Sequence, residues 1–107
     1  MKIYLSGPIT GTKDYMNRFA EAEQRLAERG HSVINPARVC ACLPKDTTYE
    51  EYMEMCMTMM GQAEAIYLMA GWQDSNGARR EFETAKIWKI KILEYYTVLL
   101  QKKIFVC

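Results

Sequence analysis

Short apolar runs and longer stretches of helical periodicity alternate along most of this chain. The apolar runs predict four buried strands, at residues 2–5, 32–34, 65–70 and 91–93. Between them, apolar residues recur at three- and four-residue spacing, which predicts three helices, over about 15–29, 49–62 and 76–88. Strands and helices that alternate without a linker or an internal repeat indicate one parallel sheet covered by helices.

The predicted fold class is therefore α/β. We expect a single-domain, Rossmann-like or flavodoxin-like three-layer sandwich with a four- to five-stranded, mainly parallel sheet. Residues 1–94 would form this domain, and the Tyr-rich, apolar residues 95–107 would add an edge strand or an arm for oligomer formation. Residues 36–47 contain two prolines and are expected to form a loop over the ligand crevice.

The helix expected at 49–62 carries an unusually broad apolar surface. Thr48 can cap this helix, with Glu51 in the third position of a capping box. Its apolar residues form two neighbouring stripes, with Tyr49, Met53, Cys56, Met57 and Met60 in one and Tyr52, Met55 and Met59 in the other. Two interpretations follow: a Met-rich core helix, or a helix that gives part of this surface to a subunit interface.

Charge and cysteine usage narrow the class of protein. The chain has 107 residues, with 14 Lys and Arg against 13 Asp and Glu, and a formal net charge of +1. This balance lacks the basic footprint of a protein that binds a nucleic acid polymer or a membrane. No apolar stretch approaches the length of a membrane span and no signal peptide is evident, so we expect a cytoplasmic protein. The four cysteines form no C-x-x-C pair and there is one histidine, so we expect free thiols and no metal site.

Two loops carry the candidate chemistry. The loop from Ser6 to Gly11 follows the first strand, and the segment from Ser75 to Glu81 follows the third. In open parallel sheets the ligand crevice lies outside the carboxyl ends of the strands, and a glycine-containing turn lets a ligand approach N–H groups at a helix start. Glu81 would stand one turn into its helix at such a crevice. The loops lack the spacings G-x-G-x-x-G and G-x4-G-K-S/T, which argues against a dinucleotide site and a P-loop.

These motifs also carry a resemblance to a known family. Four segments are involved: Lys2 to Gly11, Gly30-x3-Ile34-Asn35-Pro36, Gly71-Trp72, and Ser75-x-Gly77-Ala78-x2-Glu81. With them, residues 1 to about 94 resemble the nucleoside 2-deoxyribosyltransferase superfamily. The likeness is to its small phage-type members and to the 2′-deoxynucleoside 5′-monophosphate N-glycosidases.

The resemblance implies an N-glycosidase or deoxyribosyltransferase that acts on a nucleoside or its 5′-monophosphate without a cofactor. Glu81 would be the nucleophile that attacks C1′ and expels the base, and Tyr4 would reach the sugar and this nucleophile. The alternatives are a solvated helix residue paired with Lys86 or Arg79 for Glu81, and a core aromatic of its strand for Tyr4. Six residues before the nucleophile, the transferases tend to carry an aspartate and the monophosphate glycosidases a serine. Ser75 therefore favours a nucleotide, and Asp74, one residue earlier, weakens that preference by its charge.

The same resemblance implies substrate-binding residues in the loops and at strand ends: Ser6, Gly7, Pro8, Ile9, Thr10, Gly11, Asn35, Trp72, Ser75 and Gly77. Trp72 would stack on the base or pack at the rim under the long loop. Asn35 would contact the substrate or simply end its strand. Arg79 and Arg80 would bind phosphate or cover the surface.

The chain departs from the family pattern at Cys56. Eight residues before Glu64, the superfamily usually has an aspartate that helps to protonate the departing base, and this chain has a cysteine. A thiol with an ordinary pKa of about 8.5 is a poor substitute, and general acid catalysis typically contributes about 10²- to 10⁴-fold. Asp74, Glu54 or a neighbouring subunit would have to replace the aspartate.

This departure leaves alternatives to an enzyme. One is a non-catalytic nucleotide-binding module of the same fold, in which Cys56 replaces the usual acid and turnover is lost. Another is an assembly protein that uses its methionine stripe and C-terminal residues. For the enzyme and the binding module we expect a homo-oligomer, a dimer or larger, because sites in the family are commonly completed by a neighbouring subunit.

Overall fold

The sheet consists of parallel strands in the order β2-β1-β3-β4. These strands are β1 (Lys2–Ser6), β2 (Ser32–Ile34), β3 (Ala65–Leu68) and β4 (Lys91–Glu94). The structure is a computed structural model that describes residues 1–95, so the edge strand or oligomer arm predicted for 95–107 lies outside the described residues apart from Tyr95. The predicted α/β class with a mainly parallel sheet is confirmed.

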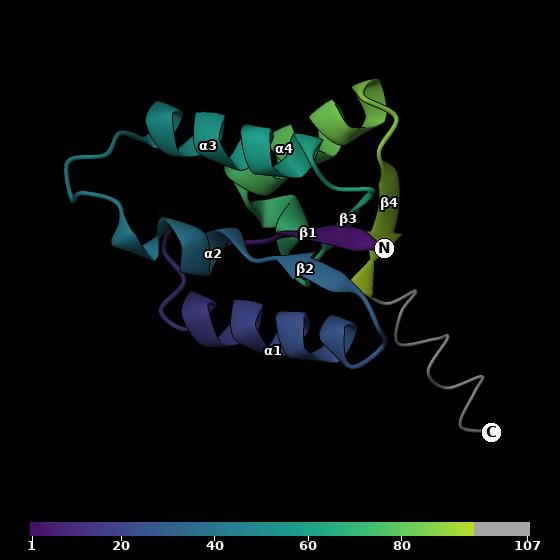
Figure 1. Ribbon diagram of the computed structural model, residues 1–107. Helices are drawn as coiled ribbons and strands as arrows, with labels where there is room; N and C mark the ends of the chain where they lie inside the picture. Colours follow the sequence, from purple (N-terminus) through teal and green to yellow (C-terminus); the bar gives the residue numbers. More distant parts are fainter. Residues whose placement is uncertain (96–107) are drawn as a thin grey trace.

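Helices cover both faces of the sheet (Figure 1). Helix α1 (Tyr15–Ala27) lies on one face, and α3 (Tyr49–Gly61) and α4 (Asn76–Ile87) lie on the other. Each predicted strand and long helix is present, with ends that differ by no more than two residues from the prediction. The three layers and this strand order are those of a flavodoxin-like fold.

The prediction for residues 36–47 was wrong in part. This segment contains two short helical turns, α2 (Pro36–Val39) and the 3₁₀ helix η1 (Cys40–Cys42). The Asn35 side chain caps α2 by accepting a hydrogen bond from the Arg38 N–H at 3.2 Å. Pro36 stands at the first helical position, where a missing N–H costs nothing. A proline that ends a strand can thus also begin a helix.

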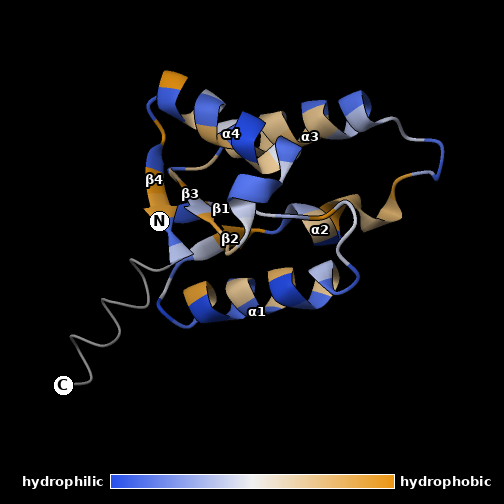
Figure 2. Ribbon diagram, turned by 180° about the vertical axis from the view of Figure 1, so that it is seen from behind, coloured by the Kyte–Doolittle hydropathy of each residue, from blue (hydrophilic) through white to orange (hydrophobic). Residues whose placement is uncertain are grey.

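Local sequence accounts for the ends of the long helices. Thr48 and Glu51 form the predicted capping box before α3: Glu51 N–H donates to Thr48 Oγ1 at 3.1 Å, and Thr48 N–H donates to Glu51 Oε1 at 2.9 Å. After α1, Gly30 adopts a φ of +87°, a conformation that side chains disfavour. Along α1 in Figure 2, hydrophobic and hydrophilic colours alternate, as expected for an amphipathic helix.

The buried side chains form two clusters, one on each face of the sheet. Ile3 and Leu5 of β1 pack in the cluster that includes Phe19 of α1. Tyr4, between them, packs in the other cluster with Met60 of α3. Successive side chains of a strand point to opposite faces, so β1 is buried on both sides.

The methionine-rich surface of α3 is divided between core and solvent. Its buried residues are Met53, Cys56 and Met60. Met55 and Tyr49 are 39% and 46% exposed. The core-helix interpretation is confirmed for the inward-facing residues, and the subunit interface stays a prediction.

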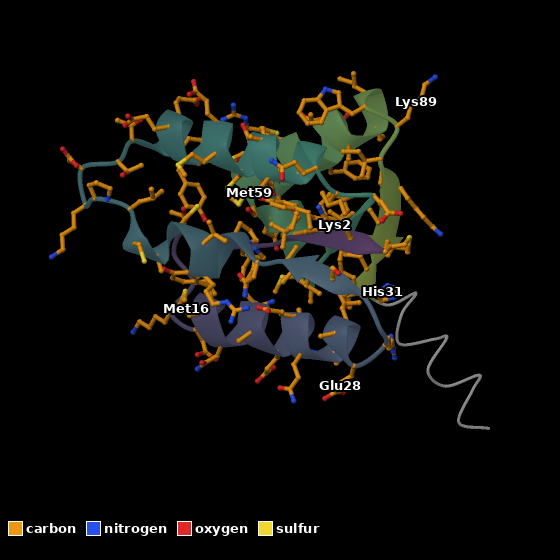
Figure 3. All side chains as sticks on the ribbon, in the orientation of Figure 1. Lys2, Met16, Glu28, His31, Met59 and Lys89 are labelled. Atoms are coloured by element: carbon orange, nitrogen blue, oxygen red, sulfur yellow. The ribbon has the colours of Figure 1, made fainter. Side chains whose placement is uncertain are left out.

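Strands β1 and β3 lie side by side, with Tyr4 opposite Ile66 and Ser6 opposite Leu68. In Figure 3, His31 and Lys89 mark the end of the molecule at which the strands begin, and Met16 lies toward the other end. The loops after β1 and β3 therefore leave the sheet next to each other, as the sequence predicts.

Within the described residues, no helix is both long and apolar enough to cross a membrane.

Candidate active site

Glu81 lies on the inner face of α4, and 5% of its surface is exposed. Tyr4 Oη donates a hydrogen bond to Glu81 Oε2 at 2.5 Å. Ser6 Oγ donates a hydrogen bond to the other carboxylate oxygen, Oε1, at 2.7 Å. Each oxygen of the buried carboxylate therefore has its own hydroxyl donor, and both donors come from β1.

The local sequence explains how these three side chains meet. Tyr4 and Ser6 are two residues apart on β1 and so point to the same face of the sheet. Ser75 caps α4, since its Oγ accepts a hydrogen bond from the Ala78 N–H at 3.2 Å. Ala78, Glu81 and Ala85 then recur at the spacing of one helix face, which is buried. The start of α4 at Ser75 thus directs Glu81 toward β1.

Burial sets the protonation of Glu81. It raises the pKa of the carboxyl to about 7, while the hydrogen bonds from Tyr4 and Ser6 and the charge of Arg80 oppose the rise. Near neutral pH the group is present in both protonated and ionised forms. Burial also raises the pKa of the Tyr4 hydroxyl, and the nearby Glu81 adds to that rise. Tyr4 is therefore a firmly protonated hydrogen-bond donor.

Glu81 lines a cavity of about 280 Å³ at the carboxyl edge of the sheet. The loop after β1 contributes Gly7, Ile9 and Thr10 to its walls. The start of α4 contributes Ser75 and Gly77. This volume is near the lower end of the range for small-molecule sites, about 300 to 1,000 Å³.

Helix α3 supplies a further wall, with Tyr52, Met53 and Cys56. Cys56 is 2% exposed. Burial raises the pKa of its thiol to about 12, and the neighbouring Tyr4 hydroxyl opposes the rise. Burial likewise raises the pKa of Tyr52. This wall is therefore uncharged at neutral pH.

The start of α4 borders the ligand space through Ser75, Gly77 and Ala78. A Cβ atom at Gly77 would lie 3.3 Å from Met53 Sδ and 3.6 Å from Tyr49 Oη, so glycine keeps this end of the helix open. A second cavity, of about 640 Å³, adjoins the first and shares Thr10, Tyr49, Ser75 and Gly77 with it. The N-terminus of a helix favours anions, so a phosphate group would fit here.

Most of the predicted site residues gather at this edge. Those that line the Glu81 cavity are Tyr4, Gly7, Ile9, Thr10, Ser75, Gly77 and Glu81. Ser6 lies behind them, hydrogen-bonded to Glu81, and Pro8 lines the second cavity. Gly11, Asn35 and Trp72 line neither of these two cavities.

Asn35 and Trp72 make contacts that serve the fold. Besides capping α2, Asn35 donates a hydrogen bond from Nδ2 to Glu23 Oε1 at 3.0 Å. Trp72 belongs to the 3₁₀ helix η2 (Trp72–Asp74), and its ring packs against Phe82 with centroids 4.8 Å apart. The indole therefore packs against α4 instead of lining the Glu81 cavity.

Sequence reasoning did not assign Thr47, Thr48, Tyr49, Tyr52 or Met53 to the site, and all of them line the Glu81 cavity. The spacing assigns Tyr49 to one apolar stripe of α3 and Tyr52 to the other. A signal was available, because a helix that leads into a parallel strand begins at the carboxyl edge of the sheet. Aromatic residues in the first turns of such a helix lie near the ligand crevice.

The charged residues named above for phosphate binding or for proton donation do not line the Glu81 cavity. Arg80 donates to the Glu50 carboxylate at 3.1 and 3.3 Å, and Arg79 donates to Asn76 Oδ1. Glu54 is exposed on α3, and Asp74 lines the second cavity. Among residues 1–95, Glu81 is the one carboxylate that lines its cavity.

Comparison with known proteins gives a family and a fold. A family model described as a domain of unknown function, DUF4406, matches residues 1–94. The chain belongs to the DUF4406 family. No curated protein matches this DUF4406 sequence. A solved structure of a 2-deoxyribosyltransferase from the psychrotolerant bacterium Bacillus psychrosaccharolyticus is similar, with a TM-score of 0.71 and 19% identity. The similarity covers 88% of the DUF4406 chain and 71% of the other chain, and it shows a shared fold.

Proposed function

We propose that this DUF4406 protein cleaves the N-glycosidic bond of a nucleoside or its 5′-monophosphate, with Glu81 as the nucleophile. The observation that carries the proposal is the buried Glu81 carboxylate, which lines a cavity and receives hydrogen bonds from Tyr4 and Ser6. The shared fold with a 2-deoxyribosyltransferase supports a deoxyribose as the sugar.

The proposed reaction has two displacements at the same carbon. The ionised Glu81 carboxylate attacks C1′ of the sugar, the C1′–N bond breaks, and its electron pair leaves with the base. The glycosyl ester that forms on Glu81 is then attacked at C1′ by water or by a second base. Two displacements retain the configuration of C1′, as in retaining glycosidases. Tyr4 and Ser6 hold the carboxylate in place, and their hydrogen bonds favour its ionised form.

A 5′-phosphate would lie at the start of α4. Ser75, Gly77 and Thr10 line both the Glu81 cavity and the second cavity, so a phosphate there would remain continuous with a sugar beside Glu81. Backbone N–H groups and the positive end of the helix dipole supply the attraction. Asp74, which lines the second cavity, opposes it by charge.

A second candidate function is a nucleotide-binding module without turnover. The observation that favours it is the Cys56 thiol in the cavity wall, whose pKa is raised to about 12 by burial. Such a group is a poor donor of a proton to a departing base.

The test is to incubate the full chain with deoxynucleosides and their 5′-monophosphates and to measure free base by chromatography. We expect base release by the wild-type protein and a loss of at least about 1,000-fold in Glu81→Gln, as for removal of other catalytic nucleophiles. The matched control is Glu83→Gln, since Glu83 lies on the same helix and pairs with Lys86 at the surface. Tight nucleotide binding by calorimetry with no release from any compound would favour the binding module instead.

A further inference from the structure

The side chains of the cavity wall that could protonate a departing base are weak acids. When the C1′–N bond of a neutral base breaks, the base departs as an anion unless a proton reaches it, and a general acid typically speeds this step by about 10²- to 10⁴-fold. The proton-bearing side chains that line the cavity near Glu81 include Tyr4, Tyr52 and Cys56. Burial raises the pKa of all three, to about 12 for Cys56. Each of them therefore gives up its proton poorly to a departing base.

The same cavity suits an organic cation. Its lining includes the aromatic rings of Tyr4, Phe19, Tyr49 and Tyr52, together with the thioether of Met53. Aromatic faces attract cations, and quaternary nitrogen compounds are commonly recognised in this way. Among residues 1–95 the one charged group in this lining is the Glu81 carboxylate, and no Lys or Arg lines the cavity. A flat, positively charged ring would be attracted by the Glu81 carboxylate and by aromatic rings of this lining, although the Tyr49 ring already has the Arg80 guanidinium 5.6 Å from its centroid.

We propose that the substrates of this site are nucleotides whose base is N-alkylated or otherwise N-quaternised and so carries a positive charge. This inference rests on the proposed function. It joins the two features above, because a cationic base both fits the lining and departs without a proton.

The reaction balances without an acid. Glu81 attacks C1′ and forms a C–O bond, while the C1′–N bond breaks and its electron pair neutralises the positive charge of the ring. The base leaves as a neutral molecule. Water then attacks C1′, the C1′–O bond to Glu81 breaks, and the sugar phosphate is released. The spare proton of the water passes to the freed Glu81 carboxylate and on to solvent.

A cationic base would also prepare the nucleophile. A positive charge within a few ångströms of a carboxyl group lowers its pKa. Binding of such a substrate would therefore increase the ionised fraction of Glu81, whose pKa burial raises to about 7 in the free protein. A neutral base gives no such assistance.

The test compares a matched pair of substrates, 2′-deoxyguanosine 5′-monophosphate and its N7-methyl derivative, with the full chain. Free base is measured by chromatography, and spontaneous release is subtracted for each compound. We expect kcat/KM for the methylated nucleotide to exceed that for the unmethylated one by at least about 100-fold, because an enzyme without a general acid retains the intrinsic difference between the two leaving groups. Values within about tenfold of each other would mean that the protein delivers a proton, and they would overturn the inference.

Variants at Cys56 give a second, independent readout. Cys56→Asp introduces a carboxylic acid into the wall, so we expect it to raise the release of guanine far more than the release of 7-methylguanine. The ratio of kcat/KM for the methylated nucleotide to that for the unmethylated nucleotide should fall by about tenfold or more. Cys56→Ser is the matched control and should keep the wild-type ratio. An equal effect of Cys56→Asp on both substrates would contradict the inference. Circular dichroism tests whether each variant is folded. If Cys56→Asp is unfolded, the ratio of kcat/KM values measured with the wild-type protein decides whether the site prefers a cationic base.

Failure of the proposed function and failure of the preference for a cationic base give different results. If no deoxynucleoside or 5′-monophosphate, these two included, is cleaved faster by the wild-type protein than by Glu81→Gln, the proposed function fails and this inference with it. If both are cleaved with similar kcat/KM, the proposed function stands and the preference for a cationic base is refuted.

Discussion

Replacing Glu81 by Gln is expected to remove a pH dependence of stability that no activity assay is needed to detect. Burial raises the pKa of Glu81 from 4.5 to about 7 in the folded protein. Between these values the native protein holds a proton that the unfolded chain has released, so rising pH destabilises the native state. Since each pKa unit is worth about 1.4 kcal/mol, the full effect is about 3 kcal/mol.

The direction in which stability changes with pH follows from the protonation of Glu81 in the folded and unfolded states. Below pH 4.5 the carboxyl is protonated in both states and costs no stability, whereas above pH 7 the buried group must be ionised and the whole cost is present. The neutral amide of Glu81→Gln has no such cost. We therefore expect the free energy of unfolding of the wild-type protein to fall by up to about 3 kcal/mol relative to that of the variant as the pH rises from 4.5 to 7.

Urea unfolding followed by tryptophan fluorescence, from pH 4 to pH 8, measures this difference. Glu83→Gln is the control. Glu83 pairs with Lys86 at 3.0 Å, the two side chains are 63% and 49% exposed, and such surface pairs contribute at most about 1 kcal/mol. Parallel stability curves for the wild-type protein and Glu81→Gln across this range would show that Glu81 is not buried beside Tyr4 and Ser6, and the account of the site would fail.

Three further changes test individual parts of the site. Tyr4→Phe removes the hydroxyl that donates to Glu81 Oε2, so the pKa of Glu81 should rise above about 7 in a carboxyl NMR titration, and an unchanged pKa would contradict the role given to that hydrogen bond. Thr48→Ala removes half of the capping box before α3 and should lower the free energy of unfolding by about 1 kcal/mol in thermal melts; no loss would mean that the cap is not needed. Gly77→Val extends a side chain toward Met53 and Tyr49, so nucleotide binding in calorimetry should weaken by about tenfold or more while circular dichroism stays native; full binding would place the ligand elsewhere.

Periodicity and loop chemistry were sufficient to predict the architecture. Strands that alternate with helices favour a parallel sheet, and the pairing of β1 with β3 brings the loops after residues 6 and 68 to one edge. The capping box at Thr48 and the stop at Gly30 were also predictable, because both depend on a few neighbouring residues. Each of these signals is local or follows from the alternation of elements.

The walls of the cavity were not predictable in the same way. Trp72 was expected beside a base or under the long loop, and it packs on Phe82 because η2 turns its ring toward α4. The spacing of Tyr49 and Tyr52 indicates only two apolar stripes, yet both line the cavity. The prolines of residues 36–47 predict a loop, and the structure has the short helix α2 there. Packing between segments distant in the chain decides these positions, and periodicity carries no information about it.

By itself, the sequence determined that a tyrosine and a serine lie on the first strand and that a carboxylate lies one turn into the helix after the third strand, since hydrophobic spacing and capping depend on adjacent residues. The tertiary structure alone decided that Tyr4 and Ser6 each donate to one oxygen of Glu81 and that Cys56 and two further tyrosines line the same cavity. It also decided the raised pKa of Glu81, because that value depends on how completely three separate elements exclude water from one carboxyl group.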